Sequence, residues 1–252
     1  MILDLLRMGS MDSAEKMELI MSIGVRIFVV FCVLPIHEFA HAYIANRLGD
    51  RTARLKGRMT ISPMAHIDPI GALMIFLVGF GYAKPVPVNM RNFRKKDKNA
   101  SEHDNIYYYS ATPRYDPGYA KRCMALVSLA GPLSNLLMAF ISLILMNISL
   151  LFASESLLIA IVYYFFFFCA SININLAVFN LIPIPPLDGS RILSVILPDK
   201  IYFKIMQYER YIMIGIMLLL FTGILSTPLG IVSNLIFNGL NFVAGLPFAL
   251  IS

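Results

Sequence analysis

The residues with the clearest chemistry form one pentad, His37-Glu38-Phe39-Ala40-His41, which lies inside an apolar run. Residues four apart share one face of a helix, so both imidazoles can reach a single metal ion. Two such histidines with a glutamate after the first are typical of zinc hydrolases, in which the glutamate is the general base. The alternative is a pair of histidines bonded to backbone or water. Ionisable groups inside a membrane are costly and usually functional, which favours the metal site.

A catalytic zinc site needs a third protein ligand, and the best candidate is Asp188. It follows a stretch with three prolines, Pro183, Pro185 and Pro186, that cannot form a regular helix. We expect this stretch to run extended beside the pentad and to bring Asp188 to the start of the next helix. The alternative role for Asp188 is a helix N-cap, which aspartate also favours.

Four other polar residues are weaker candidates. His66 and Asp68 could form an alternative ligand pair, but they lack helical spacing to His37 and more readily shape the site or bond to backbone. Asn135 and Asn180 each lie in an apolar run at the depth of the pentad, where a buried amide must find partners. Either could bond to substrate backbone or stabilise an oxyanion. Contacts between helices are the alternative, equally weighted for Asn180 and preferred for Asn135.

Composition places these residues in a membrane protein. Of the 252 residues, 58% are hydrophobic and only 14% are charged, and the mean hydropathy is +0.72. Several apolar runs reach the roughly 20 residues that span a bilayer. The sequence therefore predicts an all-α polytopic membrane protein, a single domain over residues 1–252, with about five to six transmembrane helices. The net charge of +6 comes from cations that flank apolar runs, so no nucleic-acid partner is expected.

The expected spans position the pentad and Asp188. They cover approximately residues 19–46, 123–151, 157–182, 211–226 and 231–250. Pro35 should kink the first span just before His37, because it removes one backbone hydrogen bond. Residues 69–82 are apolar but too short for an ordinary span.

The segments on either side of residues 69–82 are both basic. Residues 47–58 carry five cations against one acid, and the loop of residues 83–122 carries nine against four. Both should therefore be cytoplasmic, and residues 69–82 should re-enter the membrane from one face. Residues 59–62 could form a short strand beside them. The N-terminus would lie outside, and residues 99–119 look like a local insertion in the cytoplasmic loop.

Three motifs together resemble the site-2 protease family of intramembrane zinc metalloproteases. They are His37-Glu38-x-x-His41, Gly131-Pro132-x-x-Asn135, and Asn180-x-x-Pro183 continuing to Asp188-Gly189. The stretches 66–71 and 83–88 look like the compact prokaryotic branch, and there is no room for a PDZ-type domain. The resemblance covers about residues 20–225. It implies that His37, His41 and Asp188 bind Zn²⁺, that Glu38 is the base, and that Asn180 engages substrate.

The expected activity is hydrolysis of peptide bonds in transmembrane protein substrates, near the cytosolic leaflet of a prokaryotic cytoplasmic membrane. Because a substrate helix bonds its own carbonyls, it must unwind first, and an exposed backbone edge could hold it as an added strand. Two alternatives remain open: a membrane zinc hydrolase acting on a lipid or small molecule, and a non-catalytic metal-binding membrane protein. The second would need a fourth protein ligand, and the sequence offers no convincing one. The oligomeric state stays open.

Overall fold

The computed structural model describes residues 9, 11–78, 83–94, 116–152 and 157–248. Over these residues the fold is all-α, without a strand. Four stretches are long and apolar enough to cross a membrane: Ser13–Arg47, Pro117–Leu151, Leu157–Asn180 and Ser226–Gly245. The all-α polytopic prediction is confirmed. Of the other apolar segments, α5 (Pro69–Val78) and α10 (Glu209–Phe221) are shorter than the roughly 20 residues of a full span.

The first span is one long helix with a local defect. It consists of α2 (Ser13–Phe28), a π-helical turn η1 (Val29–Val33) and α3 (Leu34–Arg47). Asp12 caps α2 in a capping box with Glu15. Pro35 has no N–H for the carbonyl of Phe31, and the preceding Leu34 N–H bonds to Val29 O, five residues back. The disturbance predicted at Pro35 is therefore a π turn that directly precedes the pentad.

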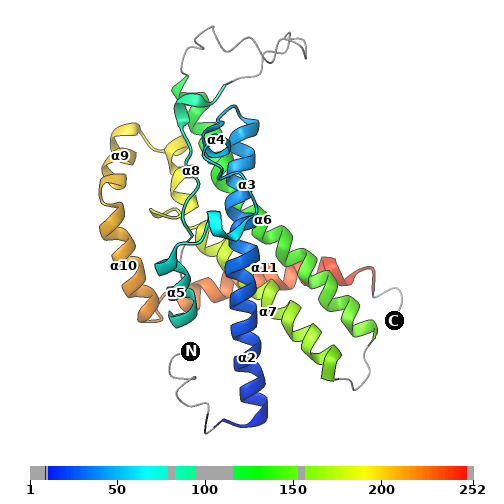
Figure 1. The fold of residues 1–252 in the computed structure, drawn as a ribbon. Helices are drawn as coiled ribbons and strands as arrows, with labels where there is room; N and C mark the ends of the chain where they lie inside the picture. The colour runs from blue at the N-terminus through cyan, green and yellow to red at the C-terminus, as the bar shows by residue number, and fades with distance from the viewer. Residues whose placement is uncertain (1–8, 10, 79–82, 95–115, 153–156, 249–252) are drawn as a thin grey trace, which may run out of the picture.

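Two further long helices, α6 (Pro117–Leu151) and α7 (Leu157–Asn180), pack against each other, and α6 also packs along α3 (Figure 1). The buried face of α6 carries many small residues, among them Ala120, Gly131 and Ala139. Small side chains let helix backbones approach closely, which brings α6 near the pentad. α6 begins six residues before the predicted start at Cys123, because Asp116 caps it and Pro117 occupies its first position.

The C-terminal part surrounds the other side of the pentad. After a bend, α8 (Asp188–Ile196) leads to α9 (Asp199–Gln207), α10 and α11 (Ser226–Gly245). α11 packs on α6 and α7, and an ion pair between Lys121 and Asp199 ties α6 to α9.

The segment between α3 and α6 contains the short helices α4 (Thr52–Leu55), η2 (Pro63–Ala65), α5 and η3 (Met90–Asn92). The short strand predicted at residues 59–62 is wrong. There the Thr60 hydroxyl accepts the N–H of Ser62, and the turn that results leads into Pro63. Residues 99–115 of the predicted insertion lie outside the described residues. Asp116 caps α6, and residues 117–119 are the first residues of that helix.

His66 and Lys84, which flank α5 in the sequence, lie next to each other. The N–H of Lys84 donates to the carbonyl of His66 at 2.8 Å, which holds the two ends of this stretch together. Ile75 of α5 lies between these two residues in the sequence. Its carbonyl accepts a hydrogen bond of 2.7 Å from the Arg26 guanidinium in the first span. This geometry fits the re-entrant prediction, because a single crossing would place the ends on opposite faces.

Candidate metal centre

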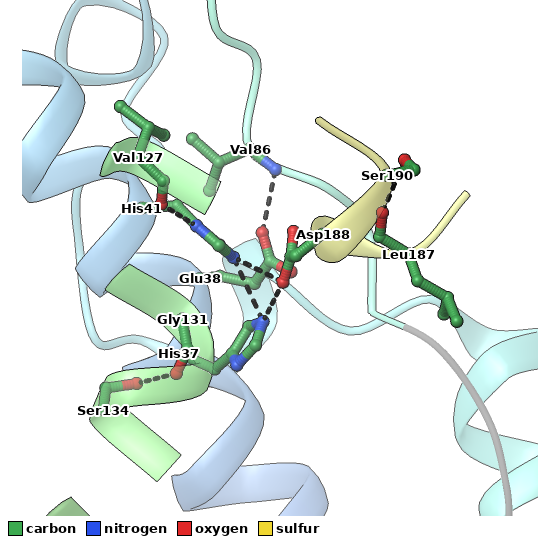
Figure 2. A network of polar contacts seen from close by, with 10 residues as sticks. All are labelled: His37, Glu38, His41, Val86, Val127, Gly131, Ser134, Leu187, Asp188 and Ser190. Carbon is green, nitrogen blue, oxygen red and sulfur yellow. Dashed lines mark hydrogen bonds and ion pairs between the residues drawn. The ribbon is translucent and has the colours of Figure 1, made fainter. Parts of the chain in front are cut away.

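The two histidines of the pentad and Asp188 meet in space (Figure 2). His37 and His41 lie one turn apart on the buried face of α3, and their Nε2 atoms are 3.1 Å apart. Each Nε2 lies 3.2 Å from Oδ2 of Asp188, which comes from the first residue of α8. Two elements far apart in sequence, α3 and α8, thus bring three donor atoms to one point, as the sequence predicted.

The spacing of these three atoms suits a zinc ion. With zinc–ligand bonds of about 2.0–2.1 Å, neighbouring ligands of a tetrahedral site lie about 3.3 Å apart. The observed separations of 3.1 and 3.2 Å agree with this edge. In the described part of the chain, the only group of three or more histidine, cysteine or acidic side chains close enough to hold an ion is this one. A tetrahedral ion would therefore keep its fourth position open for water.

The orientation of His41 also favours a metal. Its Nδ1 lies 2.6 Å from the carbonyl of Val127 in α6, and a carbonyl can only accept. Nδ1 therefore carries the proton, which leaves the Nε2 lone pair directed at the site. Nδ1 of His37 is buried and has no partner among the described residues.

Asp188 is held as a carboxylate by its surroundings. Burial disfavours its charge, but without an ion the protonated forms of the two imidazoles would hold the pKa of Asp188 well below its usual range, and a cation bound to the Nε2 lone pairs would act in the same direction. The capping alternative is wrong, because the N-cap of α8 is Leu187, not Asp188. Ionised Asp188 is a hard oxygen ligand for a divalent cation.

The bend before Asp188 differs from the extended run that the prolines predicted. Residues 181–187 form tight turns, in which Ile184 N–H bonds to Ile182 O and Leu187 N–H to Ile184 O. Gly189 makes the fold possible, because a Cβ there would lie 2.3 Å from the carbonyl of Leu181. The start of α8 therefore packs directly on the end of α7.

Gly131 of α6 provides the space for the two imidazoles (Figure 2). A Cβ at this position would lie 2.3 Å from Nε2 of His41 and 2.5 Å from Nε2 of His37. No real Cβ makes such contacts, so only glycine fits here. Its carbonyl accepts a hydrogen bond from the Ser134 hydroxyl at 2.7 Å.

Glu38 lies beside the three donor atoms and is held by an extended segment. Its Oε2 accepts the backbone N–H of Val86 at 2.9 Å. Val86 stands between Pro85 and Pro87, which have no N–H. Its amide is therefore the one backbone donor of this tripeptide, and it points at Glu38 (Figure 2).

Two cavities adjoin the site and share Glu38, Pro85, Asp188 and Arg191. One has a volume of about 420 Å³ and extends past Asn180 and Phe179 toward α10. The other measures about 370 Å³ and lies between residues 85–88 and α6. The two cavities thus offer space for a bound chain on both sides of Glu38.

The remaining predicted residues separate into two groups. Asn180 lines the larger cavity beside the donor atoms. Asn135 is 1% exposed, and neither atom of its amide has a partner among the described residues. His66 and Asp68 lie outside the donor cluster: His66 Nε2 is 2.7 Å from Thr60 O, and Asp68 accepts the N–H groups of Ile70 and Gly71. As an alternative ligand pair they are wrong, and their backbone bonds shape residues 60–71.

Sequence reasoning missed the hydrogen bond that Val86 donates to Glu38. It also missed that Gly131 and Gly189 leave the space that their neighbours occupy. The Pro-Val-Pro pattern was a usable signal, because it leaves a single N–H that needs an acceptor. The glycines give no such signal, since their importance depends on which side chains face them.

Comparisons with known proteins agree with the motifs. Residues 147–222 match the model described as Peptidase family M50. YwhC of Bacillus subtilis, named as a zinc metalloprotease, is 39% identical over 196 residues, or 77% of this chain and 76% of the relative. Rip2 of Mycobacterium tuberculosis, with the same kind of name, is 29% identical over 163 residues, or 62% of this chain and 51% of Rip2. No solved structure matches.

Proposed function

Because the chain belongs to peptidase family M50, we propose that it is an intramembrane zinc metalloprotease that hydrolyses peptide bonds of membrane-spanning proteins. The observation that carries the proposal is the meeting of His37, His41 and Asp188 at tetrahedral spacing, with Glu38 beside them. The relatives' names as zinc metalloproteases support the same chemistry.

Each residue of the site has a proposed part in the reaction. His37 and His41 through Nε2, and Asp188 through its carboxylate, hold the ion. When bound, zinc lowers the pKa of water in its open position and polarises the scissile carbonyl. Glu38 accepts the proton of the attacking water on its carboxylate and delivers it to the leaving amine. The Val127 carbonyl keeps the proton of His41 on Nδ1, so that Nε2 stays a ligand.

The surroundings support a peptide as substrate. The larger cavity is lined mainly by apolar side chains, such as Leu176, Phe179 and Ile216, and also by the amide of Asn180. We propose that Asn180 bonds to the unwound backbone of the substrate while the apolar walls accept a side chain. Asn135 is a weaker candidate for the same part, because it lines neither of the two cavities.

The charge distribution supports a site near the cytoplasmic face. Four candidate membrane helices and family membership indicate an integral membrane protein. His41 lies six residues before Arg47, which opens the basic segment of residues 47–58. Basic loops stay cytoplasmic in polytopic proteins. We therefore propose that cleavage occurs in the cytoplasmic half of the membrane.

The proposal is tested with Glu38→Gln in the purified, zinc-loaded protein. The amide keeps the shape of the side chain but cannot take a proton. We expect one zinc per chain, as in the wild type, and a fall in kcat of roughly 10²–10⁴-fold on a transmembrane substrate. Glu15→Gln, at the far end of the first span, is the matched control. A Glu38→Gln protein that cleaves at the wild-type rate, or a wild type that hydrolyses lipids but no transmembrane peptide, would contradict the proposal.

A further inference from the structure

The inference concerns a buried acid outside the metal centre. Asp50 is fully buried, with 0% of its surface exposed, and lies just after the end of α3. Isolated buried carboxylates are costly, so a stable one must accept several hydrogen bonds. Asp50 accepts four, two from Thr52 and one each from Asn89 and Asn92.

These bonds hold residues 84–94, a segment that is extended except for the short helix η3 and that we name the strap. The carboxylate accepts the backbone N–H of Asn89 at 2.6 Å and the side-chain amide of Asn92 at 3.0 Å. Farther along, Arg94 N–H donates to the carbonyl of Leu48 at 3.0 Å. Asp50 thus binds the middle of the strap to the end of the helix that carries His37 and His41.

The residue before Asp50 is adapted to the same contact. Gly49 has φ +105°, a conformation that side chains other than glycine rarely adopt. A Cβ there would also lie 3.1 Å from Arg94 N and 3.2 Å from Asn92 O. The Gly49-Asp50 pair therefore lets the strap lie directly against the chain that leaves α3.

The strap reaches the active centre three residues from the Asp50 anchor. Asn89 bonds to Asp50, and Val86 donates its N–H to Glu38 at 2.9 Å. Pro85 and Pro87 restrict the backbone of this part of the strap. Fixing Asn89 against Asp50 therefore also limits where the Val86 N–H can lie. Residues 85–88 of the strap form a wall of the smaller cavity.

We propose that Asp50 is a positioning residue for the reaction: it fixes the strap so that the Val86 amide holds the Glu38 carboxylate beside the metal ligands. This rests on the proposed function of Glu38 as the base. Asp50 touches neither substrate nor metal and acts only through the strap.

The first test measures the strap without using activity. Hydrogen–deuterium exchange is followed in the zinc-loaded wild type, in Asp50→Asn and in Asp12→Asn, a matched control that changes the capping acid of α2. Asp50→Asn should raise the exchange rate of the peptide covering residues 84–94 at least about tenfold, while α6 and α7 keep their protection. Unchanged exchange of this peptide would overturn the proposal.

The second test measures the reaction. A hydrogen bond to a charged group changes a rate by roughly 10–100-fold when it is lost. Because Asp50→Asn should weaken the bond from Val86 N–H to Glu38, its kcat should fall by that factor. The KM should stay within about twofold and the zinc content at one per chain. Val86→Pro, which removes the donor itself, should lower kcat similarly. Because both changes act through one contact, the double variant should be no slower than Val86→Pro alone.

The outcomes separate this proposal from that of the overall function. Additive losses in the double variant, or loss of zinc from Asp50→Asn, would overturn the positioning role and assign Asp50 to general stability. If the wild type cleaves no transmembrane substrate, the proposed protease function fails. The exchange measurement then still decides whether Asp50 holds the strap.

Discussion

Replacing Gly131 by alanine tests the metal centre at its most sensitive point. The added Cβ would lie 2.3 Å from Nε2 of His41, whereas ordinary contacts to a Cβ begin at 3.4 Å. Relief therefore requires a displacement of about 1 Å. Metal sites tolerate errors of only about 0.2 Å in their ligand distances, so at least one imidazole should leave the ion. A misplacement of about 1 Å also costs on the order of 10²-fold in rate.

We therefore expect Gly131→Ala to weaken zinc binding and to lower kcat/KM by about 100-fold or more. Competition with a chromophoric chelator measures the affinity, and cleavage of a transmembrane peptide measures the rate. Gly239→Ala in α11 is the matched control, because nothing lies within 4 Å of its Cβ. Alanine favours a helix over glycine by about 1 kcal/mol, so this control should be neutral or slightly stabilised.

Gly131 precedes Pro132, which offers a second reason for glycine. The proline ring restricts a preceding residue that has a Cβ. The double variant Gly131→Ala/Pro132→Ala removes this conflict and keeps the one with the imidazoles. It should bind zinc as poorly as Gly131→Ala. Recovery of wild-type affinity in the double variant, or no loss in the single one, would refute the placement of His37 and His41 against α6.

Three further predictions concern the same architecture. Asp188→Asn should keep the fold and lower zinc affinity by at least about 100-fold in the chelator assay, since it removes the one charged ligand; an unchanged affinity would place the third ligand elsewhere. Gly189→Ala brings a Cβ to 2.3 Å from Leu181 O and should lower the free energy of unfolding by about 1–3 kcal/mol, measured by thermal unfolding. Gly215→Ala, which has open space around it, should not lower it. Equal melting temperatures of the two variants would contradict the packing of Gly189 against Leu181. The third prediction uses single cysteines, Lys56→Cys or Lys84→Cys, in a protein whose native Cys32, Cys123 and Cys169 are replaced. Both should react with an impermeant maleimide from the same face of membrane vesicles, because the bond between His66 O and Lys84 N holds the two ends of the re-entrant stretch together. Labelling from opposite faces would exclude re-entry.

The sequence was most informative where one local rule determines the outcome. Spacing of four residues placed His37 and His41 on one helix face. The apolar lengths predicted five spans by range, and four of them contain helices long enough to cross a membrane. It was least reliable for residues 59–62, where a hydroxyl-to-backbone turn replaced the predicted strand, and for residues 181–187, where tight turns replaced an extended run. The first error arises because a threonine hydroxyl can compete for a backbone N–H that a strand would need. The second arises because proline excludes a helix without specifying which alternative forms.

Asp188 shows how far reasoning by elimination can reach. The need for a third ligand and the proline-rich stretch before Asp188 were enough to choose it. They did not reveal what brings it within 3.2 Å of both imidazoles. That depends on Gly189, whose missing side chain lets α8 begin against the end of α7. Such contacts are tertiary, and no single stretch of sequence encodes them.

The proposed metal centre is therefore defined as much by absent atoms as by its expected ligands. Gly131 leaves space for two imidazoles, Gly189 leaves space for the turn that carries Asp188, and Gly49 leaves space for the strap. Each glycine lies where two separate parts of the chain must approach within a few ångströms, and Gly189 and Gly49 directly adjoin Asp188 and Asp50 in the sequence. In a buried site built from distant segments, the ligands determine which ion binds. The glycines determine whether the segments can come close enough to bind it.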